Sequence, residues 1–266
     1  MKLTVNKEQI IEGLLKAAAI IPAKAGAQYL RSIWLKAEEG SLSVMSTDAN
    51  IEFTGRYPAE VAAPGLIGVQ GRAFVDLVRQ LPTGVLHLTL DEASGNLLLE
   101  QGRRTYKLPV SGAEWFQNFS AFPAENAVTW SGDFLQDILD KVGFCISDDD
   151  AMDAIACLCM KPRGNGRIDV CGLNGHQFAL VSFTHDELAE RLPEGGMLIQ
   201  KKYLADIKKW LGVDEIELNI TDKRLYLRSL DGAETLSLPR AAHEYPDYNI
   251  FMSKLASEDM HPMTLA

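Results

Sequence analysis

The chain has 266 residues, of which 47% are hydrophobic and 23% charged, and its formal net charge is −10. This composition is typical of a soluble globular protein of about two domains. It excludes a disordered chain and a uniformly basic nucleic-acid coat, although a local basic face is compatible with it. No apolar run approaches the roughly 18 residues of a membrane span, and the N-terminus lacks a signal-peptide pattern. We therefore expect a cytoplasmic protein whose four cysteines stay reduced.

The sequence contains an internal repeat. A shift of 124 to 130 positions aligns apolar, charged and turn residues of the first half with similar residues of the second. The aligned pairs include Leu14 with Ile138, Asp48 with Asn174, Gln70 with Gln200, Arg72 with Lys202, Asp76 with Asp206, Arg79 with Lys209, and Leu108-Pro109 with Leu238-Pro239. Loop insertions between fixed elements produce such a drifting shift. We predict two copies of one unit, residues 1–123 and 126–250.

In chain order, each predicted copy begins with a short strand (3–5; 128–130) and a helix whose apolar residues recur at helical spacing. Asn6 with Gln9 fits a capping box for the first helix, and Ser131 can cap its counterpart. Alternating strands such as 42–46 and 167–171 follow. A second helix is then predicted over 71–81 and 201–211, before further alternating strands. Because strands outnumber helices, the pattern predicts an α+β fold with two helices per copy on largely antiparallel sheets.

The second helix of each copy concentrates positive charge in an acidic protein. Helix 201–211 carries four lysines and one aspartate. Its predicted buried stripe is Leu204, Ile207, Trp210 and Leu211, which leaves Lys201, Lys202, Lys208 and Lys209 mostly on exposed flanks. Helix 71–81 carries Arg72 and Arg79 at the aligned positions. Two such helices could follow a phosphate backbone without reading bases, and the alternative is a pair of ordinary solvated helix flanks.

Motifs for bond chemistry are missing from the sequence. It has no P-loop, no dinucleotide fingerprint, no nucleophile elbow and no zincin helix. The dense carboxylate group Asp148, Asp149, Asp150 and Asp153 could hold a divalent cation, although an acidic loop is the more ordinary interpretation. An enzymatic function therefore has little support, and we expect neither a cofactor nor a metal.

Three segments could form an apolar groove for a short peptide. They are Ile155, the stretch 173–180, and the aromatic-rich stretch 244–251. Gly175 suits a positive φ, and His176 and Pro246 would rim the groove if the segments converge. The alternative is that all three are ordinary core.

Several of these motifs together resemble a known family. The opening Met-Lys-Leu-Thr-Val-Asn-Lys-Glu, the run 69–74 (Val-Gln-Gly-Arg-Ala-Phe), Asn174-Gly175-His176 and the run 245–248 (Tyr-Pro-Asp-Tyr) resemble the bacterial DNA polymerase III β subunit, the replication sliding clamp. The resemblance covers essentially the whole chain. Family members carry three copies of the unit, and two subunits close head to tail around duplex DNA with helices lining the hole. It implies a non-enzymatic processivity factor that encircles DNA without sequence specificity and binds polymerase and clamp-loader subunits through clamp-binding peptides.

Carried over by position, the resemblance implies two sets of site residues. The DNA-binding set is Lys24, Arg72, Arg79, Arg103, Lys201, Lys202, Lys208 and Lys209. The peptide-binding set is Ile155, Leu173, Gly175, His176, Phe178, Pro246 and Phe251. The family's usual Thr-Asp-Gly-His-Arg-Leu run reads Leu-Asn-Gly-His-Gln-Phe over residues 173–178 here, which changes the depth of the pocket and its peptide preference.

The number of units is the largest departure from the family. Two units are followed by residues 251–266, which, by the resemblance, look like the lead-in to a third unit. Two units instead of three indicate either a truncated clamp or a two-unit subunit, three copies of which would make six units. We expect head-to-tail self-association, as a dimer like the family or as a trimer. The alternative function is a clamp-like adaptor or decoy that binds clamp-binding peptides without encircling DNA.

Overall fold

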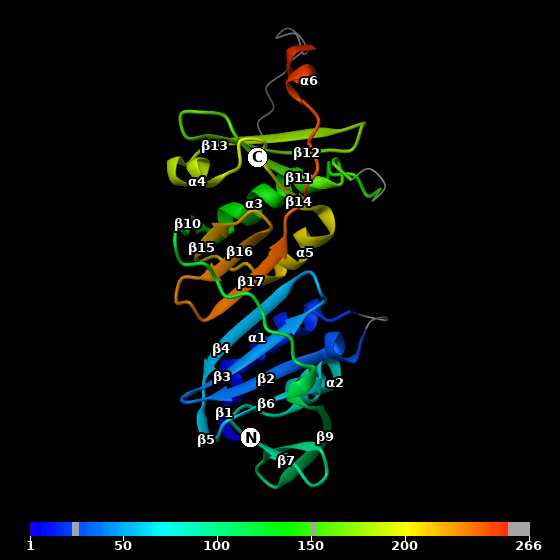
Figure 1. Ribbon diagram of the computed structural model, residues 1–266, viewed down its shortest axis with the longest axis vertical. Coiled ribbons are helices and arrows are strands. Elements are labelled where there is room, and N and C mark those ends of the chain that lie inside the picture. Colours follow the sequence, from blue (N-terminus) through cyan, green and yellow to red (C-terminus); the bar gives the residue numbers. More distant parts are fainter. Residues whose placement is uncertain (23–26, 150–152, 255–266) are drawn as a thin grey trace. The chain divides into compact units, whose positions relative to one another are not determined.

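The structure is a computed structural model that describes residues 1–22, 27–149 and 153–254 (Figure 1). The described chain packs as two compact units. The first unit is formed by Met1–Asp140 and Lys202–Arg240. The second is formed by Lys141–Lys201 and the residues from Ala241 onward. These packing units do not coincide with the two sequence copies, because strands from both copies join one sheet.

The first unit is built on a 13-stranded sheet, with strand order β10-β15-β16-β17-β4-β3-β2-β6-β9-β8-β7-β1-β5 among the described residues. Its elements from the first copy are β1 (Lys2–Asn6), α1 (Lys7–Ile20), η1 (Gln28–Arg31), β2 (Ser32–Glu38), β3 (Ser41–Thr47), β4 (Glu52–Pro58), β5 (Glu60–Ala63), β6 (Gly65–Gln70), α2 (Gly71–Gln80), β7 (Val85–Asp91), β8 (Asn96–Gln101), β9 (Arg104–Ser111) and η2 (Ala113–Trp115). Those from the second copy are β10 (Val128–Ser131), most of α3 (Gly132–Gly143), α5 (Lys201–Trp210) after its first residue, β15 (Glu215–Ile220), β16 (Arg224–Ser229) and β17 (Glu234–Pro239).

The second unit is built on a four-stranded sheet, with strand order β13-β12-β11-β14 among the described residues. Its elements are β11 (Cys157–Pro162), β12 (Arg167–Leu173), β13 (Phe178–Thr184), α4 (Asp186–Arg191), β14 (Met197–Gln200) and α6 (Asn249–Lys254). All four cysteines of the chain are buried and free. The described part of the predicted lead-in segment is helical as far as Lys254, and residues 255–266 lie outside the described residues.

The repeat is visible in the strand orders of the two sheets. The order β4-β3-β2-β6 in the first copy corresponds to β13-β12-β11-β14 in the second, and β9-β8-β7-β1 corresponds to β17-β16-β15-β10. Smaller contacts recur as well, since the Gly68–Ser111 pair has its counterpart in the Leu198–Ala241 bridge. The predicted fold class, tandem α+β repeats with helices on antiparallel sheets, is confirmed. The copy boundaries at 1–123 and 126–250 stay a prediction.

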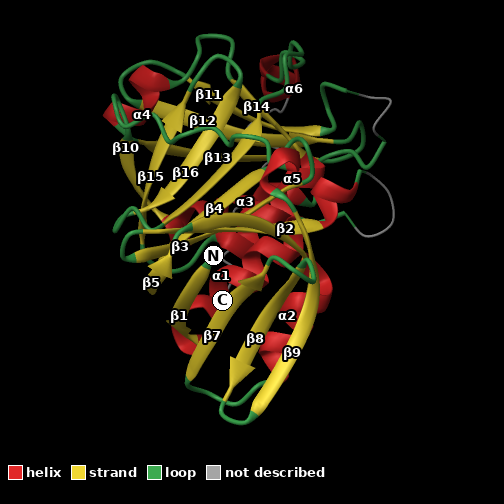
Figure 2. Ribbon diagram, turned by 60° about the horizontal axis from the view of Figure 1, so that its bottom comes forward, coloured by secondary structure: helices red, strands yellow, loops and turns green. Residues whose placement is uncertain are grey.

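Helix α1 covers one face of the first unit's sheet. It buries Ile10, Leu14 and Ala17 and packs on β3, β4 and α2 (Figure 2). The capping box predicted for this helix is wrong, because the side chain of Asn6 makes no capping hydrogen bond. Instead the amide of Lys7 donates to the carbonyl of Gly84 at 3.0 Å, so a loop satisfies the helix end. Ser131 does cap α3, since its hydroxyl accepts from the amide of Phe134 at 3.2 Å.

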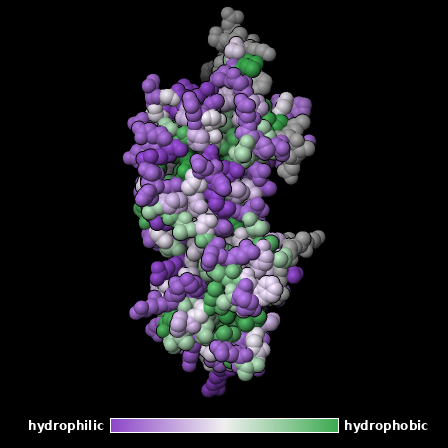
Figure 3. Space-filling model, in the orientation of Figure 1, coloured by the Kyte–Doolittle hydropathy of each residue, from purple (hydrophilic) through white to green (hydrophobic). Residues whose placement is uncertain are grey.

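Polar side chains cover most of the face seen in Figure 3, and hydrophobic residues reach it in smaller patches. Within the described part of the chain, no helix combines the length and the apolar character that crossing a bilayer requires.

Candidate functional sites: two cationic helices and an apolar groove

Helix α2 presents two arginines on its outer side. Phe74, Val75 and Val78 are buried beneath the helix, while Arg72 and Arg79 are exposed. A guanidinium nitrogen of Arg72 donates to the carbonyl of Ile21 at 3.4 Å, which keeps this arginine close to the end of α1. No carboxylate of the described residues forms an ion pair with either arginine. Both charges therefore stay available for an anionic partner.

Helix α5 has the apolar stripe that the sequence predicts. Leu204, Ile207, Trp210 and Leu211 are buried, and Tyr203 is buried with them. Lys202 and Lys209 are exposed at the positions that align with Arg72 and Arg79. The ammonium of Lys202 lies 4.9 Å from the centre of the Tyr203 ring, and that of Lys209 lies 4.0 Å from a carboxylate oxygen of Asp206.

The other two lysines of α5 are held by neighbouring groups. The ammonium of Lys201 donates to the carbonyl of Ile146 at 2.6 Å and pairs with Asp148 at 2.7 Å. Lys208 pairs with Asp140 near the end of α3. The lysines were predicted to lie mostly on exposed flanks; Lys202 and Lys209 do, whereas the side chains of Lys201 and Lys208 are only 27% and 35% exposed. Acidic groups distant in sequence approach these two and neutralise them.

The acidic loop has a partner of its own, because Asp148 forms the ion pair with Lys201. The carboxylate of Asp148 therefore balances the charge of Lys201. The amide of Asp149 donates to the hydroxyl of Ser147 at 3.1 Å. Asp150 lies outside the described residues. Among the residues that are described, no group of three or more potential metal-binding side chains is present.

Asp206 is the only acid of α5, and it is half-buried with Lys209 beside it. Burial raises the pKa of Asp206, the nearby Asp48 adds to the rise, and Lys209 opposes it. The exposed side of α5 therefore carries Lys202 and Lys209, of which Lys209 lies beside Asp206.

Contacts with α1 place the two cationic helices along one face of the first unit's sheet. Helix α1 packs against α2, and its Lys16 lies 5.8 Å from the ring centre of Trp210 in α5. Lys16 also pairs with Glu234 of β17 at 2.5 Å, and the hydroxyl of Tyr57 donates to the same carboxylate at 2.8 Å. Burial, with Glu234 beside it, raises the pKa of Tyr57, so this tyrosine stays a donor. Figure 2 shows these helices together, behind the strands.

Arg103 stands at the exposed turn between β8 and β9, next to Gly102, whose φ is +60°. The side-chain amide of Gln101 donates to the carbonyl of Pro82 at 3.0 Å, which ties this turn to the chain just after α2. The turn that carries Arg103 therefore lies close to the chain just after α2. Lys24, the remaining member of the predicted DNA-binding set, lies outside the described residues.

In the second unit, backbone hydrogen bonds bring together two of the three segments of the predicted groove. The amide of Ser147 donates to the carbonyls of both Ile155 and Leu173, at 3.1 and 3.2 Å. Leu173 is buried and Ile155 is half-buried. The two residues therefore lie side by side at one end of the four-stranded sheet.

A tight turn follows Leu173 and presents His176 to solvent. The side chain of Asn174 accepts from the amides of His176 and Gln177, at 3.0 and 2.8 Å, and Gly175 has φ +87°. The first copy has the same turn, in which Asp48 accepts from Asn50 and Ile51 at 2.8 and 2.7 Å. There Ala49 takes the positive φ, at +80°.

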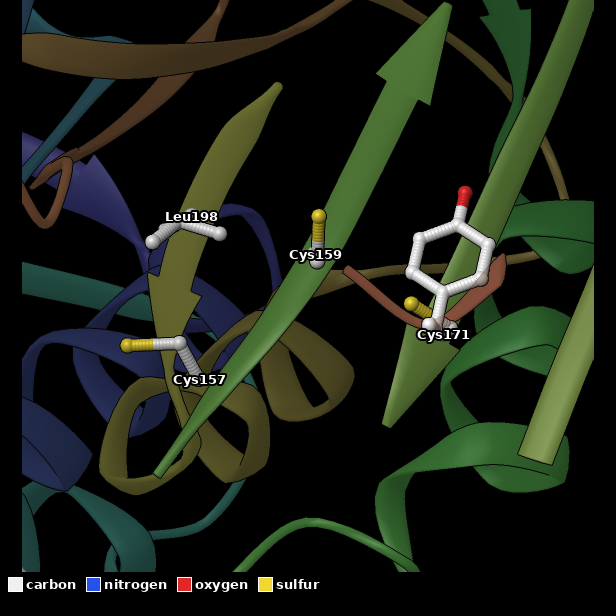
Figure 4. Close-up of a cluster of buried hydrophobic side chains, with 5 residues drawn as sticks. Cys157, Cys159, Cys171 and Leu198 are labelled. Carbon is white, nitrogen blue, oxygen red and sulfur yellow. The ribbon is translucent and has the colours of Figure 1, made fainter. Parts of the chain in front are cut away.

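Phe178 meets the third segment of the predicted groove. Its ring centre lies 5.7 Å from that of Tyr248. Both rings pack on a cluster that includes Cys157 and Cys159 of β11, Cys171 of β12 and Leu198 of β14 (Figure 4). Pro246 is half-buried two residues before Tyr248. Phe251 belongs to α6, and its side chain is not described. Phe178 therefore packs against the core of the second unit beside Tyr248.

A buried carboxylate that the sequence analysis did not single out, Asp169, binds Tyr248. Asp169 of β12 accepts hydrogen bonds from Arg163 at 2.7 Å, Ser182 at 2.6 Å and Tyr248 at 3.1 Å. Burial pushes the pKa of Asp169 upward, but the three donors outweigh it and hold the pKa below its usual value. The sequence offered one signal for this role, a single aspartate between two apolar residues of a predicted strand.

Comparison with known proteins gives consistent matches. Residues 1–120 match the family model described as DNA polymerase III beta subunit, N-terminal domain. Beta sliding clamps from Caulobacter vibrioides and Pseudomonas aeruginosa are each 23% identical to the chain, over 254 and 249 residues, and each match covers 93% of this chain and 67% of the relative. A solved sliding clamp from Caulobacter crescentus has a TM-score of 0.86 at 23% identity, with 94% of this chain and 68% of that chain covered.

Proposed function

We propose that this homologue of the bacterial DNA polymerase III β subunit is a sliding-clamp processivity factor, which holds duplex DNA without reading its sequence and tethers a polymerase. The observation that carries the proposal is the match to beta sliding clamps in both sequence and fold, extending over both copies of the repeated unit. No bond chemistry is part of this function.

The DNA-binding part of the proposal rests on α2 and α5. Arg72, Arg79, Lys202 and Lys209 are exposed, and the two helices lie on the same face of one sheet through their contacts with α1. Arg103 and Lys24 would extend this surface, whereas Lys201 and Lys208 would contribute less because carboxylates already hold them. Phosphate contacts of this kind bind any sequence and weaken with salt, which suits a protein that must slide.

The partner-binding part of the proposal places clamp-binding peptides in the groove of the second unit. Leu173 and Ile155 would form its floor, Phe178 its wall, and His176 and Pro246 its rim, with Gly175 allowing close approach of the peptide. Phe251 would lie at the far end by position. Subunits would associate head to tail, either as a dimer like the family or as a trimer of two-unit chains.

Charge reversal on the exposed cations tests the DNA-binding part. The variant Arg72→Glu/Arg79→Glu/Lys202→Glu/Lys209→Glu should bind fluorescent duplex DNA at least about tenfold more weakly at ~50 mM salt, with a shallower dependence on salt. The matched control Lys2→Glu/Lys36→Glu/Arg191→Glu/Lys223→Glu makes the same change of charge at positions away from α2 and α5. Equal loss of affinity in both variants, with circular dichroism unchanged, would contradict a local DNA-binding surface.

A clamp-binding peptide titrated into the same proteins separates the two candidate functions. Both charge variants should bind it as the unmodified chain does, since no changed residue belongs to the groove. Peptide binding by an unmodified chain that has no affinity for duplex DNA would favour the adaptor over the sliding clamp.

A further inference from the structure

The first unit has a cavity between the end of α5 and the turn that joins β16 to β17. Its volume is about 760 Å³, within the usual range of ligand pockets, about 300 to 1,000 Å³. Trp210 of α5, which is 5% exposed, forms a buried aromatic wall, and Lys16 of α1 and Ile216 of β15 also line the cavity. Because every lining residue belongs to the first unit, this cavity is a different site from the peptide groove proposed in the second.

The equivalent place in the first copy is bridged by a hydrogen bond. There β8 ends at Gln101, the turn is residues 102–103, and the side-chain amide of Gln101 donates to the carbonyl of Pro82 just after α2, at 3.0 Å. In the second copy β16 ends at Ser229 and the turn is longer, residues 230–233. The hydroxyl of Ser229 donates to Asp231 of its own turn at 2.6 Å. Within the part of the chain that the structure describes, no hydrogen bond ties this longer turn to the end of α5.

Three exposed carboxylates line the cavity, those of Asp214, Glu215 and Asp231. None of the three forms an ion pair with another described residue. The hydroxyl of Ser229 and the amide of Ala233 donate to Asp231 and hold its pKa below the usual value, so this carboxylate is ionised at neutral pH.

The only cation in the described lining is already engaged. Lys16 pairs with Glu234 at 2.5 Å, and the hydroxyl of Tyr57 donates to the same carboxylate at 2.8 Å. The cavity therefore keeps three negative charges without a cationic partner, which favours a cationic ligand.

Exposed apolar side chains accompany these charges. Leu230, which lines the cavity, is 56% exposed, and Val213, which lies between two lining residues in the sequence, is 81% exposed. The indole N–H of Trp210 is buried and has no acceptor among the described residues. Covering apolar surface lowers the free energy of a complex, and a buried donor without an acceptor raises the free energy of the chain. The site therefore suits a ligand that carries apolar groups and acceptors as well as positive charge.

We propose that this acidic cavity, defined by Trp210, Asp214, Glu215, Leu230 and Asp231, binds a peptide segment of a partner protein in which apolar side chains alternate with arginine or lysine. The cationic groups would pair with the three carboxylates, and an apolar side chain would cover Leu230. A main-chain carbonyl of the peptide would supply the acceptor that the indole lacks. The inference goes beyond the proposed function, because it adds a docking surface for a basic partner to the DNA-binding surface and the peptide groove.

Simpler ligands use fewer features of the acidic cavity. Among the described residues, no group of three side chains could hold a metal ion. A polyamine such as spermidine could pair with the carboxylates, but it would leave Leu230 and Val213 in water. Phosphates of DNA would be repelled by the carboxylates. A basic peptide with apolar side chains is the ligand that matches both the charges and the apolar surface.

Fluorescence anisotropy with a labelled Arg-Leu-Arg-Leu-Arg peptide tests the proposal on the full chain. The cavity variant Asp214→Asn/Glu215→Gln/Asp231→Asn should bind this probe at least about tenfold more weakly than the unmodified chain at ~50 mM salt, because it removes three charge pairs. Circular dichroism shows whether the variant is folded.

A matched control removes the same charge at exposed positions that do not line the cavity, in the variant Glu39→Gln/Glu92→Gln/Asp222→Asn. It should bind the probe as the unmodified chain does. Equal affinities of the cavity variant and this control would overturn the proposal. So would a folded, unmodified chain that does not bind the probe below about 1 mM.

The variant Leu230→Ser separates a peptide from a polyamine. It should bind the probe at least about threefold more weakly, with its affinity for spermidine unchanged, because only the peptide covers the leucine. Unchanged affinity for the probe, together with its complete displacement by spermidine, would assign the cavity to polyamines and overturn the peptide.

Nuclear magnetic resonance locates the bound probe. The indole N–H signal of Trp210, identified by its absence in Trp210→Phe, should move when the probe is added, and a signal that stays in place would overturn binding in this cavity. A failure here is distinguishable from a failure of the proposed function, because the residues changed belong to neither the DNA-binding set nor the peptide groove.

Discussion

The two copies share one strand order, yet corresponding strands are held in place by different forces. In the first copy, β3 and β4 are covered by α1, and Val44 and Phe53 are fully buried. In the second copy, the β12–β13 pair is fastened by Asp169, which binds Arg163, Ser182 and Tyr248. The residue aligned with Asp169 is Ser43, which is half-buried. Both copies bury apolar residues under the same topology, and the second adds a buried carboxylate at a position where the first has a half-buried serine.

Among the substitutions that test this contrast, we expect Asp169→Asn to change the free energy of unfolding most. The change removes the charge from a carboxylate that is 3% exposed and leaves Arg163 without its counter-ion, so we expect a loss of about 3 kcal/mol in the free energy of unfolding. The matched change in the first copy, Ser43→Ala, should stay within about 0.5 kcal/mol. Urea denaturation followed by circular dichroism measures both. Similar losses at the two positions would remove the contrast between the copies.

The same anchor predicts a dependence of stability on pH. Because the pKa of Asp169 is lower in the folded chain than its usual value, its contribution is fully present above the unfolded pKa of about 3.9 and is lost as pH falls through the folded pKa. The difference in urea midpoint between the unmodified chain and Asp169→Asn should therefore be constant above about pH 5 and shrink toward acid. A difference that grew on acidification would show that the carboxylate is not stabilised in the folded state.

The smallest expected change in the free energy of unfolding concerns the two equivalent turns, at Ala49 and Gly175. Gly175 and Ala49 both have positive φ, at +87° and +80°, but only glycine adopts this conformation without strain. We expect Gly175→Ala to lower, and Ala49→Gly to raise, the free energy of unfolding by about 1 kcal/mol each. A Cβ added at Gly175 would have nothing within 4 Å, so the expected loss there comes from the backbone conformation alone. Changes of the same sign in both turns would argue against equivalent backbone geometry.

Local features of this protein could be predicted well from its sequence. Helix α5 buries Leu204, Ile207 and Trp210 as its periodicity requires, and Ser131 caps α3 because both partners lie within one turn. The capping box of Asn6 was wrong because a loop carbonyl from Gly84 takes the place of the side chain. The turn at Gly175 follows from the residue type, since glycine accepts the positive φ found there.

The pairing of the residues at the candidate sites was harder to predict from the sequence, because their partners lie far away along the chain. Lys208 and Asp140 are 68 residues apart in the chain, and Lys201 and Ile146 are 55 apart, so no local pattern reveals that these lysines are engaged. The anchoring role of Asp169 depends on Tyr248, which is 79 residues away. Burial of an ionisable group is decided by packing, and packing is not encoded in the spacing of one helix or strand.

The sequence by itself determined the repeated unit, the order of its helices and strands, and the concentration of cations on the second helix of each copy. These follow from periodicity and from residue types whose preferences act over a few positions. Only the tertiary structure decided that Lys202 and Lys209 stay exposed while Lys201 and Lys208 are paired, and that β4 pairs with both β3 and β17 whereas β13 pairs with β12 alone among the described residues. Both outcomes depend on which distant groups come into contact, because Coulomb attraction and strand pairing act between neighbours in space, whatever their separation along the chain.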